Sequence, residues 1–317
     1  MVDEVIQGEG RRLDWVTLPF SRLGVLRRFG LYLPAGYGLA PRRYPVLYLF
    51  RGHETEWVGD QDGRPGLTAI LDRAIATGRI DPLVVVLPGF MDRSRMHQGV
   101  PVDWSADAEE AGLGNGRLSA HFFEIKSWVE ENLRVRVGPR STGLDGFSMG
   151  GYSAVLLGTR HPEHFGSVGA YDGSFMWPGQ IDPRRGPAGR ADRLWFSETC
   201  APYFSRDGRW DRAKMERHNP ITLIETARGR RFAALKRSVF HVRAAGTERV
   251  GNLDRTRALV DALESRGIEL SFEGSQLVLA RRARHTWYWA DRHLEGTLQL
   301  HDEIFRRDEI RGWTGVF

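Results

Sequence analysis

Residues 144–154 read LDGFSMGGYSA and place Ser148 between Gly146 and Gly150. A short strand is predicted just before the serine, and a helical pattern follows it at once. A nucleophilic serine at such a strand-to-helix turn has strained backbone angles, and the residues two positions away must be small so that strand and helix can pass closely. The stretch therefore predicts a nucleophile elbow, with Ser148 as the attacking group and the N–H of Met149 as one oxyanion donor.

Outward from the elbow, short aliphatic runs alternate with helical patterns, which is typical of a mostly parallel sheet with helices on both faces. Residues 12–33 contain strand-like segments without a helix between them, so we expect an antiparallel start to the sheet. Strands are predicted at 44–50, 83–88, 141–145, 165–171, 238–245 and 268–273, and helices near 67–78 and at 118–133, 149–160, 254–266 and 287–307. The predicted fold class is α/β, a doubly wound α/β-hydrolase sheet in one domain spanning 1–317.

One segment is too long for this scheme. Residues 175–237 separate two predicted core strands, whereas a crossover helix with its loops needs far fewer residues. The segment is rich in Arg, Pro, Gly and aromatic residues. We expect it to be an insertion that forms a cap over the carboxyl edge of the sheet.

The composition excludes several function classes. The net charge is +5, but only three basic residues are lysines and no block of five like charges occurs, so nucleic-acid binding is not expected. Cys200 is the single cysteine, which rules out an internal disulfide. The N-terminal residues lack the pattern of a secretory signal, and the apolar runs are too short to span a bilayer. We expect a cytoplasmic protein that binds no membrane.

A serine nucleophile needs a general base, because a serine hydroxyl is a weak nucleophile at its free pKa. Among ten histidines, His285 lies in ARRARHTWYW, in a loop between the last predicted strand and the final helix. The base of an α/β-hydrolase occupies this position, in the chain order serine, acid, histidine. His293 and His301 lie inside the final helix and fit less well. His285 is therefore the predicted base.

The acid that orients the base has three candidates. It is expected after the strand that ends near residue 245, in GTERVGNLD (246–254). Glu248 comes first in this loop, where a turn would direct it toward His285, and it is the acid we predict. Asp254 is the alternative, although it also fits as the N-cap of the following helix. Asp172, at the end of the strand after the elbow, is the third candidate.

A second oxyanion donor is expected in the loop after the strand at 44–50. Gly52 gives this loop the flexibility to turn the N–H of His53 inward, although a surface loop with a chance histidine is the alternative. Four aromatic residues are predicted to line a pocket for an aromatic or bulky ester, and the alternative is that they are core: Trp57, Phe175, Trp177 and Trp287.

These motifs together resemble the esterase family of α/β-hydrolases that includes esterase D, feruloyl esterases, enterochelin esterases and the antigen 85 mycolyltransferases. The resemblance covers nearly the whole chain and rests on LYLPAGY, YPVLYLF, LVVVLP, GFSMGGYSA, RHPEHF and HTWYW. It implies Ser148 as nucleophile, His285 as base, and the N–H groups of Met149 and His53 as the oxyanion hole. In two places the chain departs from the family pattern. Arg51 precedes Gly52 where a histidine is usual, and Glu248 replaces the common aspartate.

The function predicted from the sequence is that of a serine esterase acting on a small-molecule carboxylic or thio ester through an acyl-enzyme. Two alternatives remain open: an acyltransferase with an alcohol acceptor, and an inactive binding protein on the same fold. Glycine-rich 112–116 lacks a preceding strand, Asp60–Gly63 lacks EF-hand spacing, and His161 with His164 lacks a third ligand. No cofactor and no metal site are predicted, and the sequence indicates no oligomeric state.

Overall fold

The computed structural model describes residues 13–313 except 19–20, 40, 60–63, 95–98, 106, 176–199, 207–208 and 247–251. Its main sheet has eight strands in the order β1-β2-β4-β3-β5-β6-β9-β10. The strands are β1 (Leu13–Thr17), β2 (Arg28–Tyr32), β3 (Val46–Phe50), β4 (Val84–Leu87), β5 (Thr142–Gly146), β6 (Ser167–Tyr171), β9 (Val239–Arg243) and β10 (Glu269–Leu270). β1 and β2 pair antiparallel, β2 also pairs antiparallel with β4, and all strands from β4 to β10 run parallel. The predicted antiparallel start and parallel body of the sheet are confirmed.

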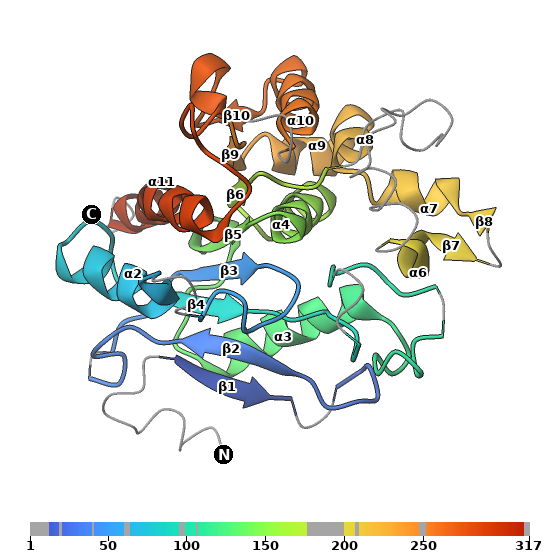
Figure 1. Ribbon diagram of the computed structural model, residues 1–317. Coiled ribbons are helices and arrows are strands. Elements are labelled where there is room, and N and C mark those ends of the chain that lie inside the picture. The colour runs from blue at the N-terminus through green and yellow to red at the C-terminus, as the bar shows by residue number, and fades with distance from the viewer. Residues whose placement is uncertain are drawn as a thin grey trace.

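Helices cover both faces of this sheet, as Figure 1 shows with α2 and α11 on one side and α4 on the other. The larger helices are α2 (Gly66–Ala76), α3 (Leu118–Asn132), α4 (Met149–Arg160), α10 (Leu253–Ser265) and α11 (Trp287–Trp313). Their bounds lie close to the predicted ranges, although α11 extends beyond residue 307. No helix in the described ranges is long and apolar enough to cross a membrane.

Side-chain alternation along the central strands produces two separate cores. In β3, Tyr48 and Phe50 belong to the core beneath α3 and α4, whereas Leu47 and Leu49 belong to the core beneath α2 and α11. Every residue of β3 is buried, because successive side chains point to opposite faces and both faces are covered. This is why the parallel strands read as continuous apolar runs.

The described part of the predicted cap, residues 200–237, contains short elements. They are α6 (Ala201–Phe204), β7 (Ser205–Arg206), β8 (Arg209–Trp210), α7 (Arg212–Arg217), α8 (Pro220–Glu225) and α9 (Gly229–Leu235). Tyr203 and Phe204 are buried in the core beneath α4, and α8 packs against α4 and α10. The first part of the segment lies outside the described residues, and the cap stays a prediction.

The chain after β10 returns to the sheet instead of extending the strand. A strand was predicted over 268–273, but only Glu269 and Leu270 pair with β9. A 3₁₀ turn, η4 (Gly274–Leu277), follows, and Val278 then pairs with Ala244 beyond the end of β9. This return brings the chain that precedes α11 to the carboxyl edge of the sheet, where β5 and β6 also end.

The turn between β5 and α4 depends on two glycines. A Cβ on Gly150 would overlap the carbonyl group of Phe50 at the end of β3, and one on Gly146 would overlap the backbone of Gly150. The α4 backbone therefore passes directly against the ends of β3 and β5. This close approach is the structural reason for the glycine pattern around Ser148.

We expect Gly150→Ala to lower the free energy of unfolding by about 3 kcal/mol, because the backbone of α4 or β3 must move to admit the methyl group. Gly38→Ala is the matched control, since a Cβ there would meet nothing within 4 Å. Urea unfolding of both variants measures the difference. Equal stability of the two variants would show that the close approach carries no constraint.

Candidate active site

Ser148 occupies the turn between β5 and α4 in a strained conformation. Its φ is 57° and its ψ −118°, in a region that residues with a Cβ rarely adopt. Two hydrogen bonds hold the turn: the N–H of Ser148 donates to the Tyr171 carbonyl at 3.0 Å, and the N–H of Gly150 donates to the Phe147 carbonyl at 2.8 Å. The predicted strand, turn and helix around this serine are therefore present.

Asp172 directly follows β6, the strand next to β5, and is the other non-glycine residue with positive φ in the described ranges, at 46°. Its carboxylate is fully buried. Oδ1 accepts hydrogen bonds from the N–H groups of Ala245 at 3.0 Å and Asn252 at 2.9 Å. The amide of Asn252 also donates to the Asp172 carbonyl at 2.9 Å. These contacts fix the carboxylate and leave Oδ2 for another donor.

That donor is His285. Its Nδ1 lies 2.5 Å from Oδ2 of Asp172, which is shorter than the roughly 2.7–2.9 Å usual for a hydrogen bond between a charged nitrogen donor and a carboxylate. The imidazole packs against Phe147, the residue before Ser148, with 4.7 Å between ring centroids. The Tyr171 hydroxyl donates to the carbonyl of Arg284 at 2.8 Å and so fixes the loop that carries the histidine. With Nδ1 bound to the carboxylate, Nε2 is the nitrogen left to accept a proton.

Of the other two acid candidates, only Asp254 belongs to the described part of the chain. Glu248, the acid predicted from the sequence, falls outside the described residues. Asp254 lies in the first turn of α10, where it forms an exposed ion pair with Arg257 at 3.0 Å. Its predicted role as N-cap is wrong, because Asn252 holds that position. Asp172 was the third candidate in the sequence, and its place after the neighbouring parallel strand is the signal that favours it.

The backbone of the loop after β3 binds a carboxylate of the protein itself, that of Glu56. The N–H groups of Gly52 and His53 both donate to Oε2 of Glu56, at 2.9 and 2.7 Å. The N–H predicted as the second oxyanion donor is thus bonded to an anionic oxygen. Met149, the other predicted donor, is buried as the first residue of α4, directly after Ser148.

Arg51, which directly follows β3, lies near two aromatic residues of the candidate site. Its guanidinium lies 5.1 Å from the ring centroid of Phe147 and 5.6 Å from that of Trp287, which brings a cation close to two aromatic faces. Nε is 3.6 Å from Oε1 of Glu56. Burial lowers the pKa of Arg51, and the charge of Glu56 partly opposes the change. The residue that departs from the family pattern is therefore a neighbour of the candidate site.

The four aromatic residues predicted to line a pocket have different environments. Trp57 is buried and donates from Nε1 to the Phe50 carbonyl at 2.9 Å, and Phe175 is fully buried in the core beneath α4. Trp177 lies outside the described residues. Trp287 packs edge-on against Trp57 and also lines a cavity.

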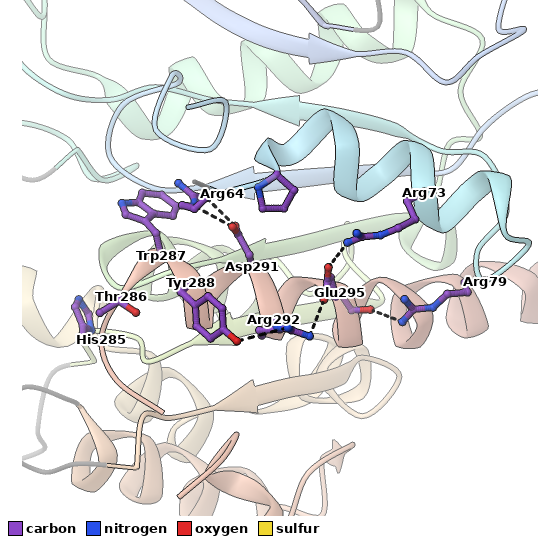
Figure 2. A pocket seen from close by; sticks show the side chains of 11 residues that line it. Arg64, Arg73, Arg79, His285, Thr286, Trp287, Tyr288, Asp291, Arg292 and Glu295 are labelled. Atoms are coloured by element: carbon purple, nitrogen blue, oxygen red, sulfur yellow. Dashed lines mark hydrogen bonds and ion pairs between the residues drawn. The ribbon is translucent and has the colours of Figure 1, made fainter. Parts of the chain in front are cut away.

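This cavity has a volume of about 760 Å³ and begins at His285 (Figure 2). It continues along the first turns of α11 toward the side chains of α2. Thr286 and Trp287 line it next to the histidine, and arginine side chains line it farther away. A molecule in this cavity would therefore contact the histidine at one end.

A second group of serine, histidine and aspartate lies inside the protein. Ser167 Oγ is 2.8 Å from Nε2 of His241 and 2.6 Å from Nδ1 of His301, and Nε2 of His301 is 3.2 Å from Oδ2 of Asp145. These contacts have the pattern of a catalytic triad, but none of the four residues is more than 1% exposed. The Thr297 hydroxyl also donates to Asp145 at 2.6 Å. We interpret the group as a polar contact between α11 and strands β5 and β6.

A family model described as "Putative esterase" matches residues 21–244 of the chain. Among curated proteins, the endo-1,4-beta-xylanase/feruloyl esterase of Xylanibacter ruminicola is 31% identical over 186 residues, which are 54% of this chain and 23% of that protein. Esterase Rv1288 of Mycobacterium tuberculosis is 26% identical over 228 residues, 70% of this chain and 45% of that protein. The chain thus spans less than half the length of these relatives.

Solved structures share the fold over almost the full chain. A ferulic acid esterase superposes with a TM-score of 0.70 and 21% identity, covering 92% of this chain and 98% of its own. An S-formylglutathione hydrolase from Agrobacterium tumefaciens gives a TM-score of 0.62 with 18% identity, over 92% and 95% of the two chains. The predicted α/β-hydrolase fold is confirmed.

The buried imidazole of His293, on α11 beside Asp145, should make the free energy of unfolding depend on pH. Burial lowers its pKa from 6.5 to about 4, so below pH 6.5 the unfolded chain binds a proton that the folded chain does not. Stability should therefore fall as the pH is lowered from about 6.5 to 4, and this group contributes up to about 3 kcal/mol of the loss. Urea unfolding at about pH 7 and at about pH 4.5 should show a smaller loss in His293→Leu than in the parent. Equal losses would contradict the lowered pKa.

Proposed function

We propose that the chain, which belongs to the esterase family whose model matches it, is a serine hydrolase of small-molecule carboxylic esters with Ser148, His285 and Asp172 as its triad. One observation carries the proposal: the bond between Asp172 and His285 lies beside the strained turn that presents Ser148. The two non-glycine residues with positive φ in the described ranges are thus the proposed nucleophile and the proposed acid. Such strain concentrates at functional sites.

In the proposed reaction, Ser148 Oγ attacks the ester carbonyl while Nε2 of His285 accepts its proton. Asp172 stays ionised, holds the imidazole with Nδ1 protonated and stabilises the imidazolium that forms. His285 then returns the proton to the leaving alkoxide, and an acyl-enzyme remains on Ser148. A water molecule attacks this ester by the same route in reverse and releases the acid.

The negative oxygen of the tetrahedral intermediate needs N–H donors. We propose the N–H groups of Met149 and His53 for this role, as the sequence predicted. That Gly52 and His53 bind the Glu56 carboxylate supports an affinity of this loop for anionic oxygen. The intermediate would have to displace Glu56 from His53 or share that donor with it.

Ser148→Ala should lower kcat for nitrophenyl acetate by about a million-fold and abolish labelling by a fluorophosphonate probe, because no other nucleophile occupies the turn. Ser167→Ala is the control, since that serine belongs to the buried group and should keep labelling and turnover. Retained labelling in the first variant, or its loss in a folded Ser167→Ala protein, would contradict the assignment.

The acid can be identified by comparing three amide variants. Asp172→Asn should lower kcat by roughly ten-thousand-fold, because the imidazole loses its orientation and the stabilisation of its charge. Asp254→Asn should keep kcat within about twofold, since only an exposed ion pair changes. A large loss in Glu248→Gln together with a near-normal Asp172→Asn protein would assign the role to Glu248.

A further inference from the structure

The cavity that begins at His285 has an aromatic inner part and an arginine-rich outer part. Arg64 and Asp291 form a buried pair through two hydrogen bonds of 2.8 and 2.7 Å. The Arg64 guanidinium also lies 4.5 Å from the ring centroid of Trp287. Both charges of this pair are satisfied within the protein, so the pair forms a wall of the cavity and offers no charge to a ligand.

The outer part is different, because three guanidinium groups surround Glu295 there, two at its carboxylate and one at its backbone carbonyl. Arg73 lies 2.5 Å and Arg292 3.8 Å from the two carboxylate oxygens of Glu295, and Arg79 donates to the backbone carbonyl of Glu295 at 3.3 Å. Figure 2 shows the three side chains converging around this glutamate. Among the described residues that line this end, two positive charges are therefore not balanced.

These guanidinium groups are also accessible. The Arg73 and Arg292 side chains are 55% and 57% exposed, whereas Glu295 is 19% exposed. Exposed arginines paired in this way contribute little to stability. Guanidinium groups match the oxygen geometry of carboxylates and phosphates and bind them through paired hydrogen bonds. The open arginine donors suit an anionic group that enters the cavity.

The chemistry of the histidine indicates which part of a substrate lies here. In the proposed reaction His285 must protonate the leaving alkoxide, so the alcohol part has to lie against its imidazole. The cavity begins at that imidazole and ends at the three arginines. The helix axis rises by about 12 Å between Trp287 and Glu295 on α11.

We propose, on the basis of the proposed function, that this cavity holds the alcohol part of the substrate and that Arg73, Arg79 and Arg292 bind a carboxylate or phosphate on it. The anionic group would lie about 12 Å from Trp287 along the wall formed by α11. The preferred substrate class is thus an ester whose alcohol carries a remote anion. The Glu295 carboxylate competes with that anion for Arg73 and Arg292.

The test uses acetate esters of ω-hydroxy carboxylic acids of increasing chain length, each paired with its neutral primary amide, and the corresponding ω-acetoxyalkyl phosphates. Acetate release gives kcat/KM for each. At low salt we expect the carboxylate to exceed its amide by about tenfold when the spacing matches the cavity, because a charge-assisted hydrogen bond is gained. Salt should reduce the ratio. The phosphate series shows which anion fits better.

Two variants should move the ratio of anionic to neutral kcat/KM in opposite directions. Arg73→Gln should lower it about fivefold to tenfold through the loss of a charged donor. Glu295→Gln should raise it, since the competing carboxylate is removed, and a loss of folded structure cannot produce such a gain. Arg257→Gln is the charge-matched control on α10, with a 52% exposed side chain, and should leave the ratio unchanged. A ratio near one at every length, or one that Arg73→Gln and Glu295→Gln leave unaltered, overturns the proposal.

The proposed anion site and the proposed serine mechanism are tested by separate measurements, so the failure of one can be told from the failure of the other. Loss of nitrophenyl acetate hydrolysis in Ser148→Ala tests the serine mechanism alone. Calorimetric binding of the non-hydrolysable ω-acetamido carboxylates to folded Ser148→Ala protein tests the anion site without turnover. Binding that Arg73→Gln weakens and Glu295→Gln strengthens supports the site, and absence of binding to both the variant and the parent overturns it.

Discussion

The backbone of α4 passes so close to the end of β3 that residue 150 has no room for a side chain. That contact sets the direction in which the chain leaves β5, and hence the strained angles of Ser148. Strain of this kind costs of order 1–3 kcal/mol and persists only where surrounding structure determines it. Here the Phe50 and Tyr171 carbonyls accept hydrogen bonds from the turn. The position of Ser148 is thus fixed by β3 and β6 as well as by β5, the strand that precedes it.

The proposed base and acid come from distant parts of the chain, and the sheet brings them together. Asp172 follows the strand beside β5, whereas His285 arrives through the return of the chain to the end of β9. The buried contacts of Asp145 with Thr297 and His301 then attach α11 to the strand that leads to the serine. This buried hydrogen-bonded group therefore helps to hold together the strand and the helix next to the proposed triad.

Much of this arrangement is readable from the sequence because it depends on local rules. Glycines at fixed spacing predicted the turn at Ser148, and the loop before the last helix predicted His285 near it. Asp172, which contacts that histidine, was only the third candidate for the acid. Asp172 and Glu248 both follow parallel strands, and hydrophobic periodicity does not show which of the two side chains turns toward the histidine. The binding of Glu56 to the loop amides depends on side-chain packing in three dimensions, and no local pattern encodes it.

The attachment of α11 to the sheet affects how the protein would lose activity on heating. The imidazole sits two residues before this helix, and the acid it contacts is 113 residues away in the chain. Segments of a native protein open with their own free energies, often well below that of global unfolding. If α11 opened as such a segment, the imidazole would leave the carboxylate while the parallel sheet stayed intact. Heat inactivation and melting of the sheet are then separate events, and amide hydrogen exchange along α11 reports the first of them.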